Sequence, residues 1–249
     1  MKRVILLKGK SWYKKHMVEA NIDLSIPKFN YDPTQVIVYG GGGLSKMIIE
    51  HVRVLGTYQI VGIIDDQIPA GTDVIGCKVI GGANKLADLY KEGIRTAFNS
   101  VGGIGNFLVR LKVFQTLAKA GFICPVLVHP SAHIDPSAKL EQGVLVLAQS
   151  YVSGNAQIGM GSLINNSVVV SHDNVLGICT NLSPGVMLAG DVILEDFVQL
   201  GMNATINIGV RVGARSVIGN GATIKEDVPA DTRVHAGSIW PPHGEHHKA

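Results

Sequence analysis

The segment VILEDFVQLGMNATINIGVRVGARSVIGNGATI, residues 192–224, carries an aliphatic side chain at every sixth position. The same spacing continues without interruption over a longer stretch, through sixteen positions in all. A period of six fits neither the turn of an α-helix, about 3.6 residues, nor the two-residue alternation of an ordinary strand. It is typical of a solenoid in which each hexad forms one short strand and one turn. The sixteen positions are Ile134, Leu140, Val146, Val152, Ile158, Ile164, Val170, Leu176, Leu182, Leu188, Leu194, Leu200, Ile206, Val212, Ile218 and Ile224.

A second set of positions, four residues after each aliphatic one, holds small or β-branched side chains, with Asn174 as the exception. Three hexads complete one triangular coil, so residues 18 apart are expected to stack above one another. The aliphatic side chains should then point inward and the small ones should fit the corners. The pattern predicts a left-handed parallel β-helix of hexapeptide repeats over residues 129–237. Five glycines directly follow inward residues, where we expect turns to use their permissive backbone: Gly159, Gly177, Gly201, Gly213 and Gly219.

Ahead of the hexads, short apolar runs alternate with segments of helical pattern. This alternation predicts a small, Rossmann-like parallel sheet with crossover helices over residues 35–128. Two further segments flank the predicted domains, a basic extension at 1–34 and a tail at 238–249. The expected strands are Gln35–Tyr39, 60–64, 78–80, 96–101 and 125–128, and the expected helices are 44–55, 83–92 and 105–120.

The composition excludes several classes of protein. With 46% hydrophobic and 16% charged residues in 249, the chain is folded rather than disordered. A net charge of +3, with no basic block after residue 15, argues against nucleic acid as a partner. There is no apolar run long enough for a membrane span, and the short apolar start lacks a cleavage site, so we expect a cytoplasmic protein. Cys77, Cys124 and Cys179 form no metal or disulfide pattern and are expected to be packed thiols.

His172 is the histidine that falls well inside the regular coils. It follows inward-facing Val170 by two residues, which places it at an outward corner, and Asp173 comes next. Gly190 lies 18 residues further on, one coil above. An imidazole assisted by a carboxylate, beside an amide that can approach a carbonyl oxygen, is the minimum set for acyl transfer. The plainer interpretation is a structural or merely exposed histidine.

A glycine-rich loop, Gly40 to Gly43, follows the first expected strand and precedes a helix. Asp65 lies 22 residues beyond Gly43, a spacing that suggests a dinucleotide fold. The GxGxxG fingerprint is incomplete, however, because its third glycine is replaced by Ser45 or by Met47. The loop is therefore weak evidence for NAD.

The chain resembles the bacterial sugar O- and N-acyltransferases that join a nucleotide-sugar-binding domain to a left-handed β-helix. These include sialic acid O-acetyltransferases and the N-acetyltransferases of UDP-4-amino-sugars and GDP-perosamine. The resemblance runs from about Gln35 to Gly237. It rests on Val36-Ile37-Val38-Tyr39-Gly40-Gly41-Gly42-Gly43, Gly62-Ile63-Ile64-Asp65-Asp66, His129-Pro130-Ser131-Ala132 and Val170-Ser171-His172-Asp173.

The resemblance implies a set of roles. His172 takes a proton from the acceptor, Asp173 supports its basicity, and the Gly190 amide faces the thioester carbonyl. It also implies a homotrimer with no metal, in which acetyl-CoA lies between neighbouring subunits. The positions implied for acetyl-CoA are Asn181, Gly190, Met202 and Asn220, and those implied for the nucleotide sugar are Gly41, Gly42, Gly43, Asp65, Asp66 and Asn165.

The chain departs from the relatives at three places. Leu44 and Asn181 stand where relatives often carry histidine, and residues 236–241 replace the usual Gly-Val-Pro-Ala ending. Leu44 leaves the identity of the sugar and nucleotide open, and Asn181 leaves the detailed contacts to coenzyme A open.

The function that we predict is acetyl-CoA-dependent N-acetylation of a nucleotide-linked 4-amino sugar for a surface glycan. O-acetylation of a sugar hydroxyl, as on sialic acid, is the nearest alternative, and a β-helix scaffold without activity is another. A γ-type carbonic anhydrase needs three histidines around zinc, and His172 has no companion histidine in the central coils.

Overall fold

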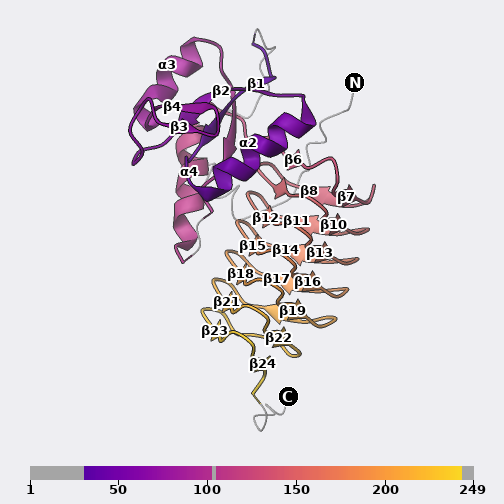
Figure 1. The fold of residues 1–249 in the computed structure, drawn as a ribbon. Coiled ribbons are helices and arrows are strands. Elements are labelled where there is room, and N and C mark those ends of the chain that lie inside the picture. The colour runs from indigo at the N-terminus through magenta and orange to yellow at the C-terminus, as the bar shows by residue number, and fades with distance from the viewer. Residues whose placement is uncertain (1–30, 103–104, 243–249) are drawn as a thin grey trace.

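The computed structural model describes residues 31–102 and 105–242, which form an N-terminal α/β unit followed by a parallel β-helix (Figure 1). The predicted fold class is thereby confirmed. Most of the predicted basic extension (1–30) and the end of the predicted tail (243–249) lie outside the described residues.

The α/β unit is built on a five-stranded sheet of order β3-β4-β2-β1-β5 within the described residues. β1 is the central strand, and Val36, Ile37 and Val38 are fully buried, as its β-branched run predicts. The strands pair in parallel except β3, which adds an antiparallel edge that the sequence did not predict. The strands are β1 (Gln35–Tyr39), β2 (Gln59–Ile64), β3 (Asp73–Val74), β4 (Cys77–Gly81) and β5 (Thr96–Asn99).

The helices occupy the predicted segments. α2 begins at the last glycine of the loop, Gly43, with Gly42 as its N-cap, and its C-cap is Gly56, whose φ of 66° suits glycine. The helices are α2 (Gly43–Leu55), α3 (Leu86–Lys91) and α4 (Phe107–Lys119), with a 3-10 turn, η1 (Ala83–Lys85), before α3.

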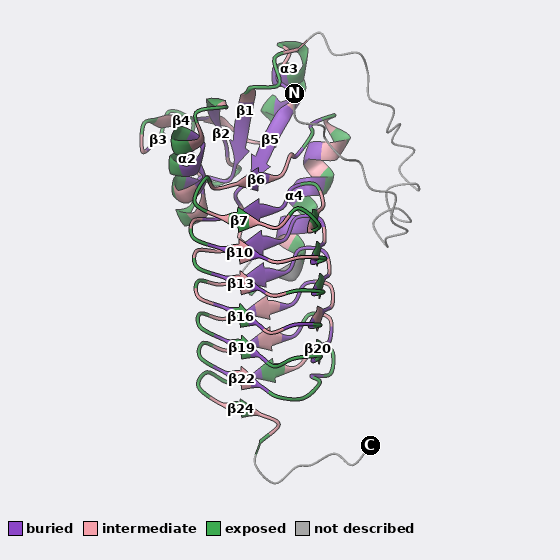
Figure 2. Cartoon of the chain, turned by 90° about the vertical axis from the view of Figure 1, so that its right-hand side faces the viewer, coloured by how far each residue is buried: buried purple, intermediate pink, exposed green. Residues whose placement is uncertain are grey.

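The β-helix consists of three sheets, named here by their first strands, to which each coil contributes two-residue strands. Figure 2 shows the strands of the β7 sheet stacked one per coil. The β6 sheet holds β6 (Leu127–Val128), β9 (Leu145–Val146), β12 (Leu163–Ile164), β15 (Asn181–Leu182), β18 (Gln199–Leu200), β21 (Val217–Ile218) and β23 (Arg233–Val234). The β7 sheet holds β7 (His133–Ile134), β10 (Tyr151–Val152), β13 (Val169–Val170), β16 (Met187–Leu188), β19 (Thr205–Ile206), β22 (Thr223–Ile224) and β24 (Ile239–Trp240). The β8 sheet holds β8 (Lys139–Leu140), β11 (Gln157–Ile158), β14 (Val175–Leu176), β17 (Ile193–Leu194) and β20 (Arg211–Val212).

The coils begin earlier and end later than the hexad pattern predicts. Residues 125–128 were expected to add a strand to the α/β sheet, and this expectation is wrong, because β6 pairs with β9 in the first coil. At the other end β24 pairs with β22, so the stack continues to Trp240. The pairing partner of a two-residue strand determines which sheet the strand joins, and the local sequence does not reveal that partner.

The inward positions form a continuous core, as predicted. Val146, Val152 and Ile158 are at most 1% exposed, and the residues of later coils stack on them. Asn174, the exception among the corner residues, is also buried. Its amide donates to the Ser171 carbonyl, and its Oδ1 accepts from the Val192 amide at 2.6 Å, so its polar atoms are satisfied.

The glycines that follow inward residues have a different role from the one expected. Gly159 is not in the left-handed region, and a Cβ there would lie 2.6 Å from the backbone of Gly177 in the next coil. Glycine is thus required by the close approach of stacked coils rather than by its φ angle. The left-handed turn positions are instead filled by residues such as Asn155 (φ 59°) and Asp173 (φ 59°).

A Gly159→Ala variant is therefore expected to be destabilised by about 3 kcal/mol, because its Cβ would meet backbone that cannot move aside. Gly154→Ala in the same coil is the matched control, since its Cβ would meet only side-chain atoms, the Ser137 hydroxyl at 3.2 Å and Oδ2 of Asp135 at 3.8 Å, and should cost little. Urea unfolding at a fixed protein concentration measures both. Equal midpoints for the two variants would contradict the stacking explanation.

The α/β unit is joined to the coils through Arg110 of α4, which is buried. Its Nε donates to the Gly161 carbonyl at 2.6 Å, and its Nη1 donates to the carbonyls of Asn99 and Val101. Cys124 and Cys179 are buried nearby and are free thiols, in agreement with the expectation for them. No helix in the part of the chain that the structure describes is long and apolar enough to cross a bilayer.

Candidate active site

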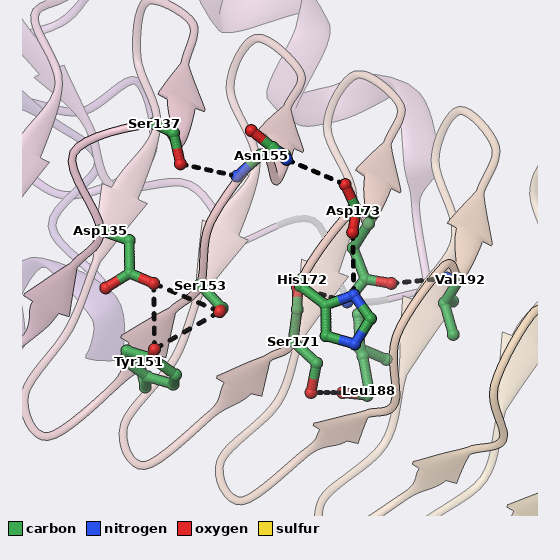
Figure 3. Close-up of polar contacts among 11 residues, drawn as sticks. Asp135, Ser137, Tyr151, Ser153, Asn155, Ser171, His172, Asp173, Leu188 and Val192 are labelled. Atoms are coloured by element: carbon green, nitrogen blue, oxygen red, sulfur yellow. Dashed lines mark hydrogen bonds and ion pairs between the residues drawn. The ribbon is translucent and has the colours of Figure 1, made fainter.

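His172 follows β13 and lies on the corner between the β7 and β8 sheets, where sequence spacing placed it. Its Nδ1 is 2.8 Å from Oδ2 of Asp173 (Figure 3). An ionised carboxylate can only accept, so Nδ1 carries a proton, and in the neutral ring Nε2 then has the free lone pair. Nε2 has no hydrogen-bond partner among the described residues, and 59% of the side chain is exposed. The geometry is that of a general base aimed at solvent.

Gly190 lies directly against this imidazole. A Cβ at Gly190 would lie 2.4 Å from Cε1 and 2.6 Å from Nε2 of His172, so no other residue fits without moving the ring. The Gly190 carbonyl accepts from Gly209, whereas its N–H donates to no acceptor within residues 31–102 and 105–242. A free amide and a free imidazole nitrogen therefore lie side by side, as the 18-residue spacing predicted.

Asp173 is held from two sides. Oδ2 accepts from His172, and Oδ1 accepts from the Asn155 side-chain amide at 3.1 Å. These hydrogen bonds, first that of His172 and then that of Asn155, hold the pKa of the Asp173 carboxyl below its usual range. Asn155 is absent from the predicted site, although it lies 18 residues before Asp173, the same spacing that identified Gly190.

The glycine loop is open toward solvent at two of its positions. A Cβ at Gly42 or Gly43 would meet nothing within 4 Å, and neither residue has a positive φ. No contact within the described residues therefore requires glycine there, whereas a ligand that approaches the backbone closely would. Gly41 differs, because its N–H donates to Oδ2 of Asp65 at 2.7 Å.

The two predicted nucleoside-binding aspartates also hold the loop together. Oδ1 of Asp65 accepts from the amides of Gln67 and Ile68. Asp66 accepts from the Tyr39 hydroxyl at 2.6 Å and from the Ala83 amide at 2.8 Å. Oδ1 of Asp65 already accepts two hydrogen bonds, whereas its Oδ2 and both oxygens of Asp66 accept one each. These three oxygens retain room for one more donor, so a structural role and a ligand contact are compatible.

The remaining predicted residues are not beside His172 in this chain. Asn181 is buried in β15, and its amide lies 3.5 Å from the Gly102 carbonyl of the α/β unit. The Met202 amide donates to Oδ1 of Asn220 at 2.9 Å. Met202, Asn220 and Asn165 follow strands of the β6 sheet and therefore lie at a different corner of the prism from His172.

Known proteins share both halves of this architecture. Residues 35–117 match the family described as the PglD N-terminal domain. A GDP-perosamine N-acetyltransferase from Caulobacter crescentus, solved in complex with CoA and GDP-perosamine, is 32% identical, with a TM-score of 0.76 over 81% of this chain and 93% of that one. The chain belongs to the hexapeptide acyltransferase family.

Another relative of this hexapeptide acyltransferase is the acetyltransferase domain of PglB from Neisseria gonorrhoeae, which is 30% identical. Its TM-score is 0.74, over 81% of this chain and 96% of that one. The acyl-[acyl-carrier-protein]–UDP-N-acetylglucosamine O-acyltransferase of Nautilia profundicola is 33% identical over 76 residues. That match covers 30% of this chain and 29% of the relative, so this chain spans less than a third of that curated protein.

Where α2 of this acyltransferase meets the first coils, a cavity of about 360 Å³ lies beside two histidines. His51 of α2 is 2% exposed, and its ring centroid is 4.8 Å from that of His129. Both ring nitrogens of His51 lack a hydrogen-bond partner among the described residues. Burial lowers the pKa of His51 below its usual 6.5 and outweighs the nearby Val128 backbone, which acts to raise it, while the neighbouring His129 acts in the same direction as burial.

This histidine predicts acid sensitivity. Because the folded pKa of His51 is depressed, the unfolded chain binds more protons once the pH falls below about 6.5, and the free energy of unfolding decreases there. The contribution of one such group is at most about 1.4 kcal/mol per pH unit. Lys46, Glu50 and His129 line the same cavity and are present in both wild type and the His51→Phe variant. The difference between wild type and His51→Phe therefore isolates the effect.

Urea unfolding of both proteins at pH 5, 6, 7 and 8 measures how the free energy of unfolding depends on His51. We expect wild type to lose stability between pH 7 and 5 more steeply than His51→Phe, while the variant is at least as stable at pH 8, because it buries no unpaired polar atom. Parallel pH profiles for the two proteins would contradict the assignment.

Proposed function

We propose that this protein is an acetyl-CoA-dependent N-acetyltransferase that acts on a nucleotide-linked 4-amino sugar in the cytoplasm, in the synthesis of a surface glycan. The observation that carries the proposal is the contact between His172 and Gly190, which sets a free imidazole nitrogen beside a free backbone amide. The relatives that bind CoA together with GDP-perosamine support it.

In the proposed reaction, the nitrogen of the sugar amine attacks the acyl carbon of the thioester. Nε2 of His172 removes a proton from that amine during the attack. The Gly190 N–H donates to the carbonyl oxygen as that oxygen gains negative charge. His172 then returns a proton to the departing sulfur as the carbon–sulfur bond breaks, so the imidazole ends neutral. Asp173 stabilises the imidazolium that exists between these two transfers. Acetyl-CoA supplies the activated acyl group, and the transfer is direct.

The donor and acceptor sites are assigned to the residues implied by family resemblance. Asn181, Gly190, Met202 and Asn220 would contact acetyl-CoA, while Gly41, Gly42 and Gly43 would hold the sugar-nucleotide phosphates. The open space around Gly42 and Gly43 supports that role. Asp65, Asp66 and Asn165 complete the proposed acceptor site.

A homotrimer follows from the same assignment. Asn165, Met202 and Asn220 lie at one corner of the prism and His172 at another, so one chain does not bring these three proposed ligand contacts to its own base. Parallel prisms packed around a threefold axis would place one chain's His172 corner near the next chain's β6 sheet. Light scattering that gives an active particle of three times the chain mass supports this, and an active monomer refutes it.

The experiment that tests the function is thiol release from acetyl-CoA across a panel of acceptors. The panel holds UDP-, dTDP- and GDP-linked 4-amino-6-deoxy sugars, CMP-sialic acid and free sialic acid. Release with one amino sugar is the expected result and names the substrate. Release with the sialic acids alone would replace the proposal with sugar O-acetylation, and no release from any member would overturn the proposed reaction.

A further inference from the structure

We infer that Asn155 is a positioning residue that orients the Asp173 carboxylate, and through it selects the tautomer of His172. The consequence for catalysis rests on the proposed function, whereas the orientation itself is a property of the folded chain. Neither Asn155 nor its contacts belong to the site that the sequence predicts.

One chain of hydrogen bonds runs along the corner between the β7 and β8 sheets and links Ser137, Asn155, Asp173 and His172 (Figure 3). The Ser137 hydroxyl accepts from the Asn155 backbone amide at 3.0 Å. The Asn155 side-chain amide donates to Oδ1 of Asp173 at 3.1 Å, and Oδ2 of Asp173 is 2.8 Å from Nδ1 of His172. Ser137, Asn155 and Asp173 are 18 residues apart in turn, so each stands one coil above the last.

The turn conformation alone does not account for an asparagine at this position. Asn155 has a φ of 59°, in the left-handed region where asparagine is favoured. Equivalent turns elsewhere in the coils accept Gln149 (φ 61°), Ser167 (φ 57°) and Arg215 (φ 60°). The fold therefore tolerates several side chains here, whereas an amide at position 155 supplies a donor to the partner of His172.

A carboxylate on an exposed corner needs such a donor to stay in place. Asp173 is 45% exposed, and either of its two equivalent oxygens could turn toward water. With Oδ1 occupied by Asn155, Oδ2 remains directed at Nδ1 of His172. The imidazole then keeps its proton on Nδ1 and presents the Nε2 lone pair outward, beside Gly190. An imidazole with the opposite tautomer has its lone pair on the wrong nitrogen and cannot act as the base.

The test is the ¹⁵N spectrum of His172 in the full-length protein without substrates, recorded above the pH at which the ring becomes neutral. Protonated and unprotonated ring nitrogens have well-separated shifts, and His172→Ala identifies the resonances. Asn155→Gly suits a positive φ and removes only the amide, while Asn155→Asp keeps the shape but places a second carboxylate against Asp173. Gln149→Gly is the matched control, at the same turn position on another corner of the same coil.

In wild type and Gln149→Gly we expect Nδ1 to have the shift of a protonated nitrogen and Nε2 that of an unprotonated one. In Asn155→Gly both shifts move toward each other as the second tautomer becomes populated, and in Asn155→Asp they move further. Identical His172 shifts in all four proteins would overturn the inference.

Turnover separates this inference from the proposed function. If the protein transfers acetyl groups, Asn155→Gly should lower kcat by about 10-fold at nearly constant KM, as loss of a supporting hydrogen bond does elsewhere. Gln149→Gly should retain wild-type kcat. An altered tautomer in a protein that shows no acetyl transfer with any acceptor would leave the positioning role standing and refute the function. Normal turnover in both Asn155 variants would overturn the positioning role and leave the function standing.

Discussion

Replacing His172 with alanine is expected to lower kcat for acetyl transfer by about 10²- to 10⁴-fold, the range over which general bases contribute. The loss should fall on kcat and leave the KM for acetyl-CoA nearly unchanged, because the free Nε2 faces the acceptor amine in the proposed reaction. Steady-state thiol release with the accepted amino sugar measures both constants. The fold should be unaffected, since the side chain is 59% exposed.

The matched control for this variant is His133→Ala. His133 lies in strand β7 itself and, like His172, pairs with an aspartate, with Nε2 3.0 Å from Oδ1 of Asp135. It has no proposed part in the reaction, so its removal should leave kcat within about twofold of wild type. A His172→Ala protein that retains full turnover would refute the mechanism, whatever the substrate is.

The second large effect is expected from Gly190→Ala. The added methyl group would lie 2.4 Å from Cε1 of His172 and would force the imidazole away from the amide beside it. A displacement of about 1 Å in a reacting group costs about 10²-fold in rate, so kcat should fall by that order. The KM for acetyl-CoA should rise as well, since the methyl group occupies the approach to the Gly190 N–H.

Stability separates this effect from a folding defect. The Gly190 methyl group would meet an exposed side chain, whereas that of Gly159→Ala meets backbone, so Gly190→Ala should unfold at nearly the wild-type urea concentration. Gly154→Ala, at the same position two coils earlier, should likewise keep the wild-type stability. If Gly190→Ala turned over at the wild-type rate, contact between the amide and the imidazole would have no part in catalysis.

The regular parts of the fold could be predicted because the residue type at each repeated position had a single physical explanation. The inward aliphatic positions, β1 and the stacking of Gly190 on His172 follow from periodicity and burial alone. The edge hairpin of β3 and β4 and the placement of Leu127–Val128 in the first coil depend on pairing partners that no local pattern reveals.

The supporting parts of the site were harder to predict. Asn155 lies at the spacing that identified Gly190, but counted toward the N-terminus, and a turn asparagine has a structural explanation of its own. The contact of His51 with His129 joins two segments that only the docking of the α/β unit brings together. The glycines after inward residues were predicted to serve turns with a permissive backbone, and this reason was wrong. Glycine is required there because the backbone of the next coil lies too close for a Cβ, which becomes visible only once the coils are stacked.

The bond that the enzyme makes is the most direct test of its proposed activity. The product formed from deuterium-labelled acetyl-CoA and the accepted nucleotide sugar should be isolated, treated with neutral hydroxylamine and assigned by NMR. We predict one acetyl group on the C4 nitrogen, resistant to hydroxylamine because it is an amide, and no such product from the His172→Ala protein. A hydroxylamine-labile ester, or thiol release without any acetylated sugar, would contradict the account.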